Sequence, residues 1–583
     1  MAALKKPSDV TAVDPDADRA VAARLLAEGG RSRLAGDLAG AEACFEQAIE
    51  RSYDFAEAHL ALGDLQAASG RDEDALECYQ LAVHFSPQLS AAYLALAAAL
   101  VRAQRFDEAE AACRTAISLE SAASNAWFML GNALKARGDL AQAAEAYRVA
   151  VQAVPSHLDA LHQLAFVEAR LGRYDDAYRN YRVLLAAAPA SPNAHHNLGL
   201  LQLETGYPQE ALASFHCALA LQPGTIASLT CAGHALRDLG RIDDAIAAYD
   251  EALALQPGFG DASGNRSQAL LMRGDYAAGW ESYEDRFAAN GTAARTHGRP
   301  RWRGEPLAGK RIVVLPEQGV GDEIMFASCL PDLVAAAAHS VIECNSRLVN
   351  LFARSFPQAR VRAIDAEVDA ELAQADFEVS AGSLPRYLRA APELFPRHAG
   401  YLQTDPARRK FWRERLAVDG AKWRVGIAWR GGTLRNRQYL RSLELADLLP
   451  VLQTADCAFF SLQHGDYAGD LHTLHSRHGI EVRERALDAG GDLDEFAAMT
   501  AAFDLVITVD NTVAHLCGAL GMPVWILLPF SAEWRYGRVG AALPWYPSAR
   551  LFRQPQPRAW TPVIAAVAEA LPQYLMEAHV RPA

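Results

Sequence analysis

Three short polar segments hold the residues whose types and spacing could do chemistry. The first is PEQGVGDE, in which Gly319 and Gly321 permit a tight turn and the close approach of a ligand. Asp322 follows at the start of a predicted helix, where a carboxylate can act as a general base that faces a cleft. Aspartate is also favoured as a helix cap, because its charge suits the helix dipole. The residues alone leave both interpretations open.

The second segment is WRGGTLRNRQYLRSL, and it is basic. Guanidinium groups bind diphosphates and carboxylates bidentately, so we interpret it as an anion-binding loop. The alternative is a solvated loop or a network of ion pairs with acidic side chains elsewhere. Gln463, at the end of FFSLQ, either hydrogen-bonds a base or sugar or caps its own loop. Four arginines fall within twelve residues with no acidic residue between them: Arg430, Arg435, Arg437 and Arg441.

The third segment, VITVDNTVAHLCGALGMPVWILLP, predicts a strand, a turn, a helix and a second strand. Asp510, Asn511 and Thr512 end the first strand, and His515 follows one helical turn later. The free N–H groups and the positive end of the helix would attract an anion. The four side chains therefore fit the phosphates and sugar of a nucleotide sugar. The alternative is a helix cap at Asp510 or Asn511 with His515 packed in the interior.

Two further motifs have the spacing of metal ligands but are better explained as helix features. DLDEF, residues 492–496, directly precedes a predicted helix that Asp492 or Asp494 would cap. HTLHSRH places three histidines on a polar stretch that predicts a solvated helix. The nine cysteines show no C-x-x-C spacing. We therefore expect no metal site and no cofactor.

The elements that position these segments differ between the two halves of the chain. In the first half a small residue recurs every 34 residues, a large residue usually follows four positions later, and a glycine usually stands five positions before it. This spacing predicts eight helical hairpins over residues 22–293, after a disordered stretch over residues 1–21. The small residues are Ala41, Ala75, Ala109, Ala143, Ala177, Ala211, Ala245 and Gly279.

The second half alternates strands and helices after a basic linker at residues 294–310. This alternation predicts parallel sheets in two Rossmann-like lobes, over residues 311–405 and 406–583, with a closing helix packed across them. Ligands bind beyond the carboxyl ends of such strands. A cleft between the two sheets would therefore collect the loops at 317–323, 429–441 and 510–515.

The bulk properties of the 583 residues exclude several classes of function. The net charge of −14 argues against a general nucleic-acid binder, because phosphate binding needs a basic surface. The N-terminal stretch has no apolar run that could serve as a signal peptide, and no stretch approaches the ~18 apolar residues of a membrane span. The scattered cysteines are typical of reduced thiols, so we expect a cytoplasmic protein. From the net charge we expect no nucleic-acid partner.

The repeat spacing resembles that of tetratricopeptide repeats, which form an α-solenoid whose concave groove binds a protein segment. The GD loop, WRGG, SLQ and VDNTVAHLCGALGMPVW are similar to motifs of bacterial repeat-fused glycosyltransferases. The catalytic half of those enzymes resembles the heptosyltransferase group, which has the GT-B fold. Protein O-GlcNAc transferases share this plan, and enzymes that combine these two halves include ones that glycosylate flagellin in the cytosol.

This resemblance implies a function and roles for individual residues. The function is transfer of a sugar from a nucleotide sugar to Ser or Thr of an acceptor protein, with flagellin as the expected acceptor. Asp322 would be the catalytic base, and Asp510 and His515 would hold the donor. This chain departs from the family at Asn511 and Thr512, which replace Thr-Gly. Two alternatives stay open: a heptosyltransferase-like glycan transferase, and a repeat scaffold with an inactive transferase lobe.

Overall fold

The computed structural model describes residues 15–120, 124–289, 295–367, 370–432, 440–484 and 492–580. The chain divides into two compact units, Met1–Leu201 and Gln202–Ala583. The boundary falls inside a helix of the repeat array, so the last repeats belong to the same unit as the sheets.

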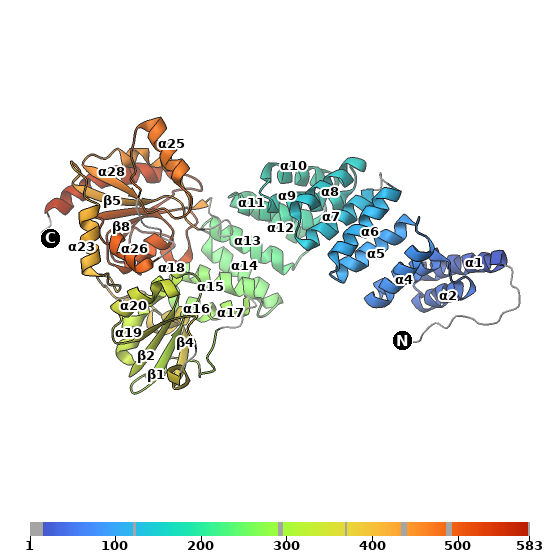
Figure 1. The fold of residues 1–583 in the computed structure, drawn as a ribbon, viewed down its shortest axis with the longest axis horizontal. Coiled ribbons are helices and arrows are strands. Elements are labelled where there is room, and N and C mark those ends of the chain that lie inside the picture. The colour runs from blue at the N-terminus through green and yellow to red at the C-terminus, as the bar shows by residue number, and fades with distance from the viewer. Residues whose placement is uncertain are drawn as a thin grey trace. The chain divides into compact units, whose positions relative to one another are not determined.

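The first unit consists of helices that pack in pairs along the chain (Figure 1). Its first helix begins seven residues before the predicted start, because Pro15 suits a first helical position and Asp16 and Asp18 complement the helix dipole. The rest of the stretch predicted to be disordered, residues 1–14, lies outside the described residues. The helices are α1 Pro15–Leu34, α2 Leu38–Arg51, α3 Ala56–Ala68, α4 Asp72–Phe85, α5 Ser90–Arg102, α6 Phe106–Leu119, α7 Ser124–Arg137, α8 Leu140–Ala153, α9 Leu158–Arg170, α10 Tyr174–Ala187 and α11 Pro192–Glu204.

The repeats pack for the reasons that their spacing predicted. All seven alanines of the pattern are fully buried. A Cβ atom added at Gly63 would lie 2.7 Å from the ring of Tyr79, and one added at Gly131 would lie 2.5 Å from Tyr147, so each ring needs a glycine opposite it. The turn glycines have left-handed backbone angles, and Gln104 adopts the same geometry (φ 59°) where one repeat lacks the glycine.

The second unit begins with the remaining repeat helices, which contact both sheet regions. The indole N–H of Trp280 donates to the Arg389 carbonyl at 3.1 Å, and its ring packs edge-on against Trp534, with 5.4 Å between centroids. Arg286 forms a buried ion pair with Glu317 at 2.9 Å. These helices are α12 Pro208–Leu221, α13 Ile226–Asp238, α14 Ile242–Leu255, α15 Gly260–Arg273, α16 Tyr276–Tyr283 and α17 Arg286–Ala289.

The first sheet has four parallel strands in the order β3-β2-β1-β4. Four of the five residues of β1 are buried, as expected for a strand covered on both faces. The strands are β1 Arg311–Leu315, β2 His339–Cys344, β3 Arg360–Ala363 and β4 Phe377–Ser380, and the helices among them are α18 Val320–Phe326, α19 Leu330–Ala336, α20 Val349–Ser355, α21 Ala370–Ala373 and α22 Leu384–Leu388.

The second sheet has five parallel strands in the order β6-β5-β7-β8-β9, so the predicted parallel sheets are confirmed. We expected the last helix, α28, to pack across both lobes; its buried face instead belongs to the core of this sheet. The strands are β5 Trp423–Ala428, β6 Cys457–Ser461, β7 Leu505–Val509, β8 Val524–Leu528 and β9 Ala549–Arg553. The helices are α23 Pro406–Arg415, α24 Leu449–Leu452, α25 Ala468–His478, α26 Leu493–Thr500, α27 Thr512–Ala519 and α28 Trp560–Val580.

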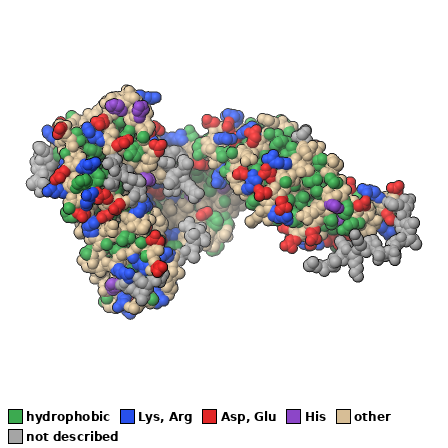
Figure 2. Space-filling model, in the orientation of Figure 1, with side chains coloured by type: hydrophobic (Ala, Val, Ile, Leu, Met, Phe, Trp, Pro, Cys, Tyr) green, Lys and Arg blue, Asp and Glu red, His purple; other side chains and the backbone are tan. Residues whose placement is uncertain are grey.

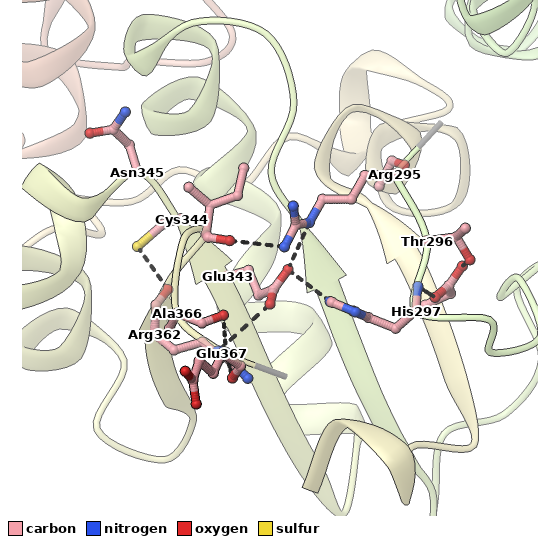
Figure 3. A network of polar contacts seen from close by, with 12 residues as sticks. Arg295, Thr296, His297, Glu343, Cys344, Asn345, Arg362, Ala366 and Glu367 are labelled. Atoms are coloured by element: carbon pink, nitrogen blue, oxygen red, sulfur yellow. Dashed lines mark hydrogen bonds and ion pairs between the residues drawn. The ribbon is translucent and has the colours of Figure 1, made fainter. Parts of the chain in front are cut away.

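The predicted linker packs on the first sheet. The Trp302 N–H donates to the Glu378 carbonyl, and the Glu378 N–H donates to the Pro300 carbonyl, both at 2.9 Å. The Glu343 carboxylate accepts from Arg295 at 3.2 Å and contacts the His297 ring at 3.0 Å (Figure 3). The reason is electrostatic, because Glu343 and Glu378 are buried carboxylates that need donors. We call Arg295, Thr296, His297, Arg301, Glu343 and Glu378 the linker cluster.

Charged side chains of both signs are interspersed on the face of the molecule in Figure 2. The three histidines of α25 are exposed, as a solvated helix predicts, and Asp492 caps α26 by accepting from the Asp494 N–H at 2.9 Å. Within the described residues no group of three His, Cys, Asp or Glu side chains could hold a metal ion. Among the described helices, none has both the length and the apolar character needed to cross a membrane.

Candidate functional site

A cavity of about 560 Å³ in the second unit is lined by the loops that follow β1, β5, β6 and β7. These are carboxyl ends of parallel strands, where open α/β sheets bind ligands. The volume is within the range of small-molecule sites. Arg437 lies outside the described residues, as does Arg435. All other predicted site residues line this cavity: Gly319, Gly321, Asp322, Arg430, Gln463, Asp510, Asn511, Thr512 and His515.

Asp322 lies in the first turn of α18, and it does not cap that helix. The N-cap is Gly319, whose backbone is extended and which makes no side-chain cap. The Asp322 carboxylate instead accepts a hydrogen bond from the Arg535 guanidinium, with 2.7 Å between Oδ1 and Nη2. The capping interpretation of Asp322 is therefore wrong, and the carboxylate is held at the cavity wall by an ion pair.

Asn511 is the residue that caps α27. Its Oδ1 accepts from the N–H of Val513 at 2.9 Å and of Ala514 at 3.3 Å. Its Nδ2 donates to the Arg430 carbonyl at 3.3 Å, which joins the loops after β7 and β5. The Asn511 side chain therefore holds the chain's own backbone, whereas that of Thr512 is exposed in the cavity.

Asp510 is buried and fully engaged by other side chains. Its Oδ1 accepts from the Tyr536 hydroxyl at 2.7 Å, and its Oδ2 accepts from Arg441 Nη1 at 3.0 Å. Arg441 also pairs with Glu533. A carboxylate with both oxygens occupied orients its neighbours and is a poor direct ligand for a substrate.

His515 is buried between α27 and α18. Its Nδ1 lies 2.9 Å from the Tyr546 hydroxyl. A Cβ atom at Gly321 would lie 3.2 Å from His515 Cδ2, so the glycine allows the two helices to approach. Burial, and next the charge of Arg535, lower the pKa of His515 to about 3. The imidazole is therefore neutral near pH 7 and can act there only through a hydrogen bond.

Gln463 and Arg430 hold the loops after β5 and β6 together. Gln463 is buried, and its Oε1 accepts from the backbone N–H groups of Trp429 at 3.0 Å and Arg430 at 2.8 Å. The Arg430 guanidinium pairs with Asp470 and donates to the Asp466 carbonyl at 3.0 Å. For Gln463 the loop-cap interpretation is thus confirmed.

The three described arginines of this cavity are all paired with carboxylates: Arg430 with Asp470, Arg441 with Asp510 and Glu533, and Arg535 with Asp322. Arg430 and Arg441 therefore form the ion pairs that the alternative interpretation describes, and their role in anion binding stays a prediction. No acidic residue lies between Arg430 and Arg441 in the sequence, but their partners come from segments elsewhere in the chain that the fold brings close.

Sequence reasoning missed the segment after β8. Glu533, Arg535 and Tyr536 follow that strand and contribute an acid, a base and a hydroxyl to the cavity network. A signal was available, because β8 is another parallel strand and its carboxyl end faces the same edge of the sheet as β7.

A second cavity, of about 390 Å³, adjoins the first on the side of the repeat helix α15. Asp261, Asn265 and Gln268 of that helix line it. Three residues line both cavities: Asp322, Arg441 and Arg535. The Asp322 carboxylate is thus reached both from the strand loops and from the repeat array.

These features describe a helical-repeat protein with a polar cavity at the ends of parallel strands. A tetratricopeptide-repeat family model matches residues 34–90, 94–157, 163–224 and 232–294, so the chain contains tetratricopeptide repeats.

Comparison with curated proteins finds similarity to Protein FlbA of Caulobacter vibrioides, at 36% identity over 324 residues. The match covers 52% of this chain and 54% of FlbA, so the chain spans about half the length of that relative. Similar solved structures include a tetratricopeptide repeat protein from Parabacteroides merdae (15% identity, 43% of this chain and 99% of that one, TM-score 0.36). PilF of Pseudomonas aeruginosa is another (18% identity, 37% and 96%, TM-score 0.33).

Proposed function

We propose that the chain is a protein O-glycosyltransferase that transfers a sugar from a nucleotide sugar to Ser or Thr of an acceptor protein, and that its two sheets are the lobes of a GT-B fold. The repeats would dock the acceptor, with flagellin as the expected protein, in the cytoplasm. One observation carries the proposal: Asp322 lines both cavities, so it is accessible from two sides. A group-transfer base needs that position, because it must meet the acceptor beside the donor.

The donor fits the larger cavity. Loops at the ends of parallel strands commonly bind nucleotides, and the exposed Thr512 hydroxyl stands at the positive end of α27, whose dipole favours phosphate although Asn511 caps the N–H groups of Val513 and Ala514. Neutral His515 would supply a hydrogen bond without adding charge.

The acceptor fits the smaller cavity. Its α15 wall is polar, and Arg237 of α13 donates to Asn265 at 2.9 Å and Gln268 at 3.2 Å. Such side chains can hydrogen-bond an extended polypeptide, and docking on the repeats would raise its local concentration at Asp322.

The reaction follows from this placement. Asp322 would take the proton of the acceptor hydroxyl. The hydroxyl oxygen would form a bond to the anomeric carbon as the bond from that carbon to the phosphate oxygen breaks. The electron pair would leave with the nucleotide, whose growing negative charge needs fixed cations nearby.

One observation favours the rival function of a repeat scaffold with an inactive lobe: Asp322 is already paired with Arg535. A glycan transferase, the other alternative, has no such support, because its small acceptor needs no polar repeat wall.

Intact-mass analysis separates these functions. The purified protein is incubated with flagellin and a panel of sugar nucleotides. Transfer adds the mass of one or more sugars to flagellin, and Asp322→Asn abolishes it. Asp419→Asn, at an exposed position, is the matched control and should transfer normally. Flagellin that binds the protein but gains no mass with any donor would favour the scaffold.

A further inference from the structure

Arg535 is the least satisfied charged group at the junction of the two cavities. It belongs to the short helical turn Trp534–Tyr536 after β8, and it lines both cavities. A guanidinium carries five N–H donors. Within the described residues Arg535 makes one hydrogen bond, from Nη2 to Asp322, and its buried Nε has no partner there. Buried charged donors without partners are costly, so such a group indicates a ligand.

The other acids near Arg535 form no hydrogen bond with it within the described residues. Both oxygens of Asp510 are occupied, by Tyr536 and Arg441. Glu533 pairs with Arg441. Arg441 therefore has two fixed partners, whereas Arg535 shares a single carboxylate oxygen with Asp322.

We propose that Arg535 binds the phosphate of the nucleotide donor, and that in doing so it leaves Asp322, so that donor binding frees the catalytic base. This inference rests on the proposed function. A phosphate offers several acceptor oxygens in the bidentate geometry that a guanidinium prefers, whereas Asp322 accepts from Arg535 through one oxygen only. A carboxylate oxygen that no longer accepts from a guanidinium has its lone pairs free to meet the acceptor hydroxyl. The ion pair would thus keep Asp322 inactive until a donor is present.

Binding of nucleotides and of their nucleosides to the full chain tests this, because the two probes differ only in phosphate. Dissociation constants are measured by calorimetry for UDP, GDP, dTDP and CMP and for uridine, guanosine, thymidine and cytidine. Arg535→Gln should reduce the advantage of the preferred nucleotide over its nucleoside by about tenfold or more and leave nucleoside binding unchanged. Arg535→Lys should keep part of the advantage. Arg415→Gln, at an exposed position of α23, is the control.

Asp322→Asn supplies an independent test, because the expected change in nucleotide affinity is none or an increase. Because this variant removes the carboxylate that competes for Arg535, it should bind the nucleotide at least as tightly as the wild type while it loses transfer. A merely structural ion pair would give weaker binding in both variants.

The outcomes separate the two hypotheses. An unchanged nucleotide advantage in Arg535→Gln and Arg535→Lys, or weaker nucleotide binding in Asp322→Asn, overturns the inference and leaves the proposed function standing. A wild-type protein that binds none of the nucleotides and modifies no acceptor overturns the proposed function, and the inference with it.

Discussion

Two ionic clusters lie in the second unit, and Glu378 of the first is hydrogen-bonded far more fully than Arg535 of the second. In the linker cluster the Glu378 carboxylate accepts from the Thr296 hydroxyl at 2.6 Å and the His297 N–H at 2.8 Å, and Arg301 lies 3.3 Å away. The chain itself saturates this acid. We call Asp322, Arg441, Asp510, Glu533 and Arg535 the cavity cluster. In this cluster the Arg535 guanidinium makes a single hydrogen bond, to Asp322, and it lines the cavity of about 560 Å³.

This difference distinguishes a structural charge from one that is available to a ligand. Buried ions are stable only when hydrogen bonds replace the water that they lose. Where the protein supplies all of those bonds, as at Glu378, the cluster fixes a segment of chain. Where it supplies too few next to a cavity, as at Arg535, a ligand can supply the rest.

The largest expected effect comes from Asp322→Asn. If the cavity cluster is catalytic, loss of the general base should lower the rate of sugar transfer by about 10²–10⁴-fold, with little change in the melting temperature. Rates are measured by intact mass over time and folding by circular dichroism. A variant that retains more than about a tenth of the rate would place the base elsewhere.

The linker cluster should behave in the opposite way. Glu378→Ala removes the acceptor of the Thr296 hydroxyl and of the His297 N–H and the partner of the partly exposed Arg301, so the free energy of unfolding should fall by about 2 kcal/mol. Nucleotide affinity at the remaining folded protein should be unchanged. Urea denaturation followed by tryptophan fluorescence measures the loss. Glu378→Gln keeps two acceptor lone pairs and should lose less; equal losses would mean that volume, and not hydrogen bonding, matters at this position.

The sequence predicted where the cavity residues meet but not what they bind. Strand ends in parallel sheets converge by a general rule, so Asp322, Arg430 and Asp510 could be placed together. Their partners could not be predicted, since Arg441 and Asp510 are 69 positions apart and Arg535 and Asp322 are 213 apart. Such pairs depend on side-chain packing after the fold has formed.

The fold was predictable to a similar degree. The 34-residue period and the alternation of strands and helices gave the hairpins and the parallel sheets, because both arise from local spacing. The packing of the linker could not be predicted from its basic composition. Its partners Glu343 and Glu378 sit inside strands, where a carboxylate gives no local sign of what covers it.

The pH dependence of stability tests whether His515, which lines the larger cavity, is neutral in the folded chain. With its pKa lowered from 6.5 to about 3 by burial, His515 stays neutral in the folded chain while the unfolded chain takes up a proton, so stability falls as pH drops below 6.5. At pH 5 the free energy of unfolding is lower by about 2 kcal/mol because of His515. Burial raises the pKa of Glu323 from 4.5 to about 7. Its effect on stability has the opposite sign to that of His515, because the stability that the protonated Glu323 carboxyl contributes is lost as the pH rises through 7.

The two contributions oppose each other between pH 4.5 and 6.5, so single variants are needed to see them. Relative to the wild type, His515→Gln should gain stability on acidification over this window, and Glu323→Gln should gain it as the pH rises. Melting temperatures at half-unit pH steps measure both. Parallel curves for the wild type and His515→Gln would mean that the imidazole is solvated in the folded chain.

The smallest expected effect concerns the loop contact that shapes the cavity cluster. A Cβ atom at Gly431 would lie 2.3 Å from the Asp510 carbonyl oxygen, so Gly431→Ala must push the loops after β5 and β7 apart, at a cost of about 1 kcal/mol. At Gly30 of α1, which does not line the cavity, a Cβ atom would meet no atom within 4 Å, so Gly30→Ala is the matched control. Calorimetry should show weaker nucleotide binding only for Gly431→Ala. Equal affinities would indicate that the ligand does not depend on the spacing of these two loops, and that Arg535 and the β1 loop hold it without them.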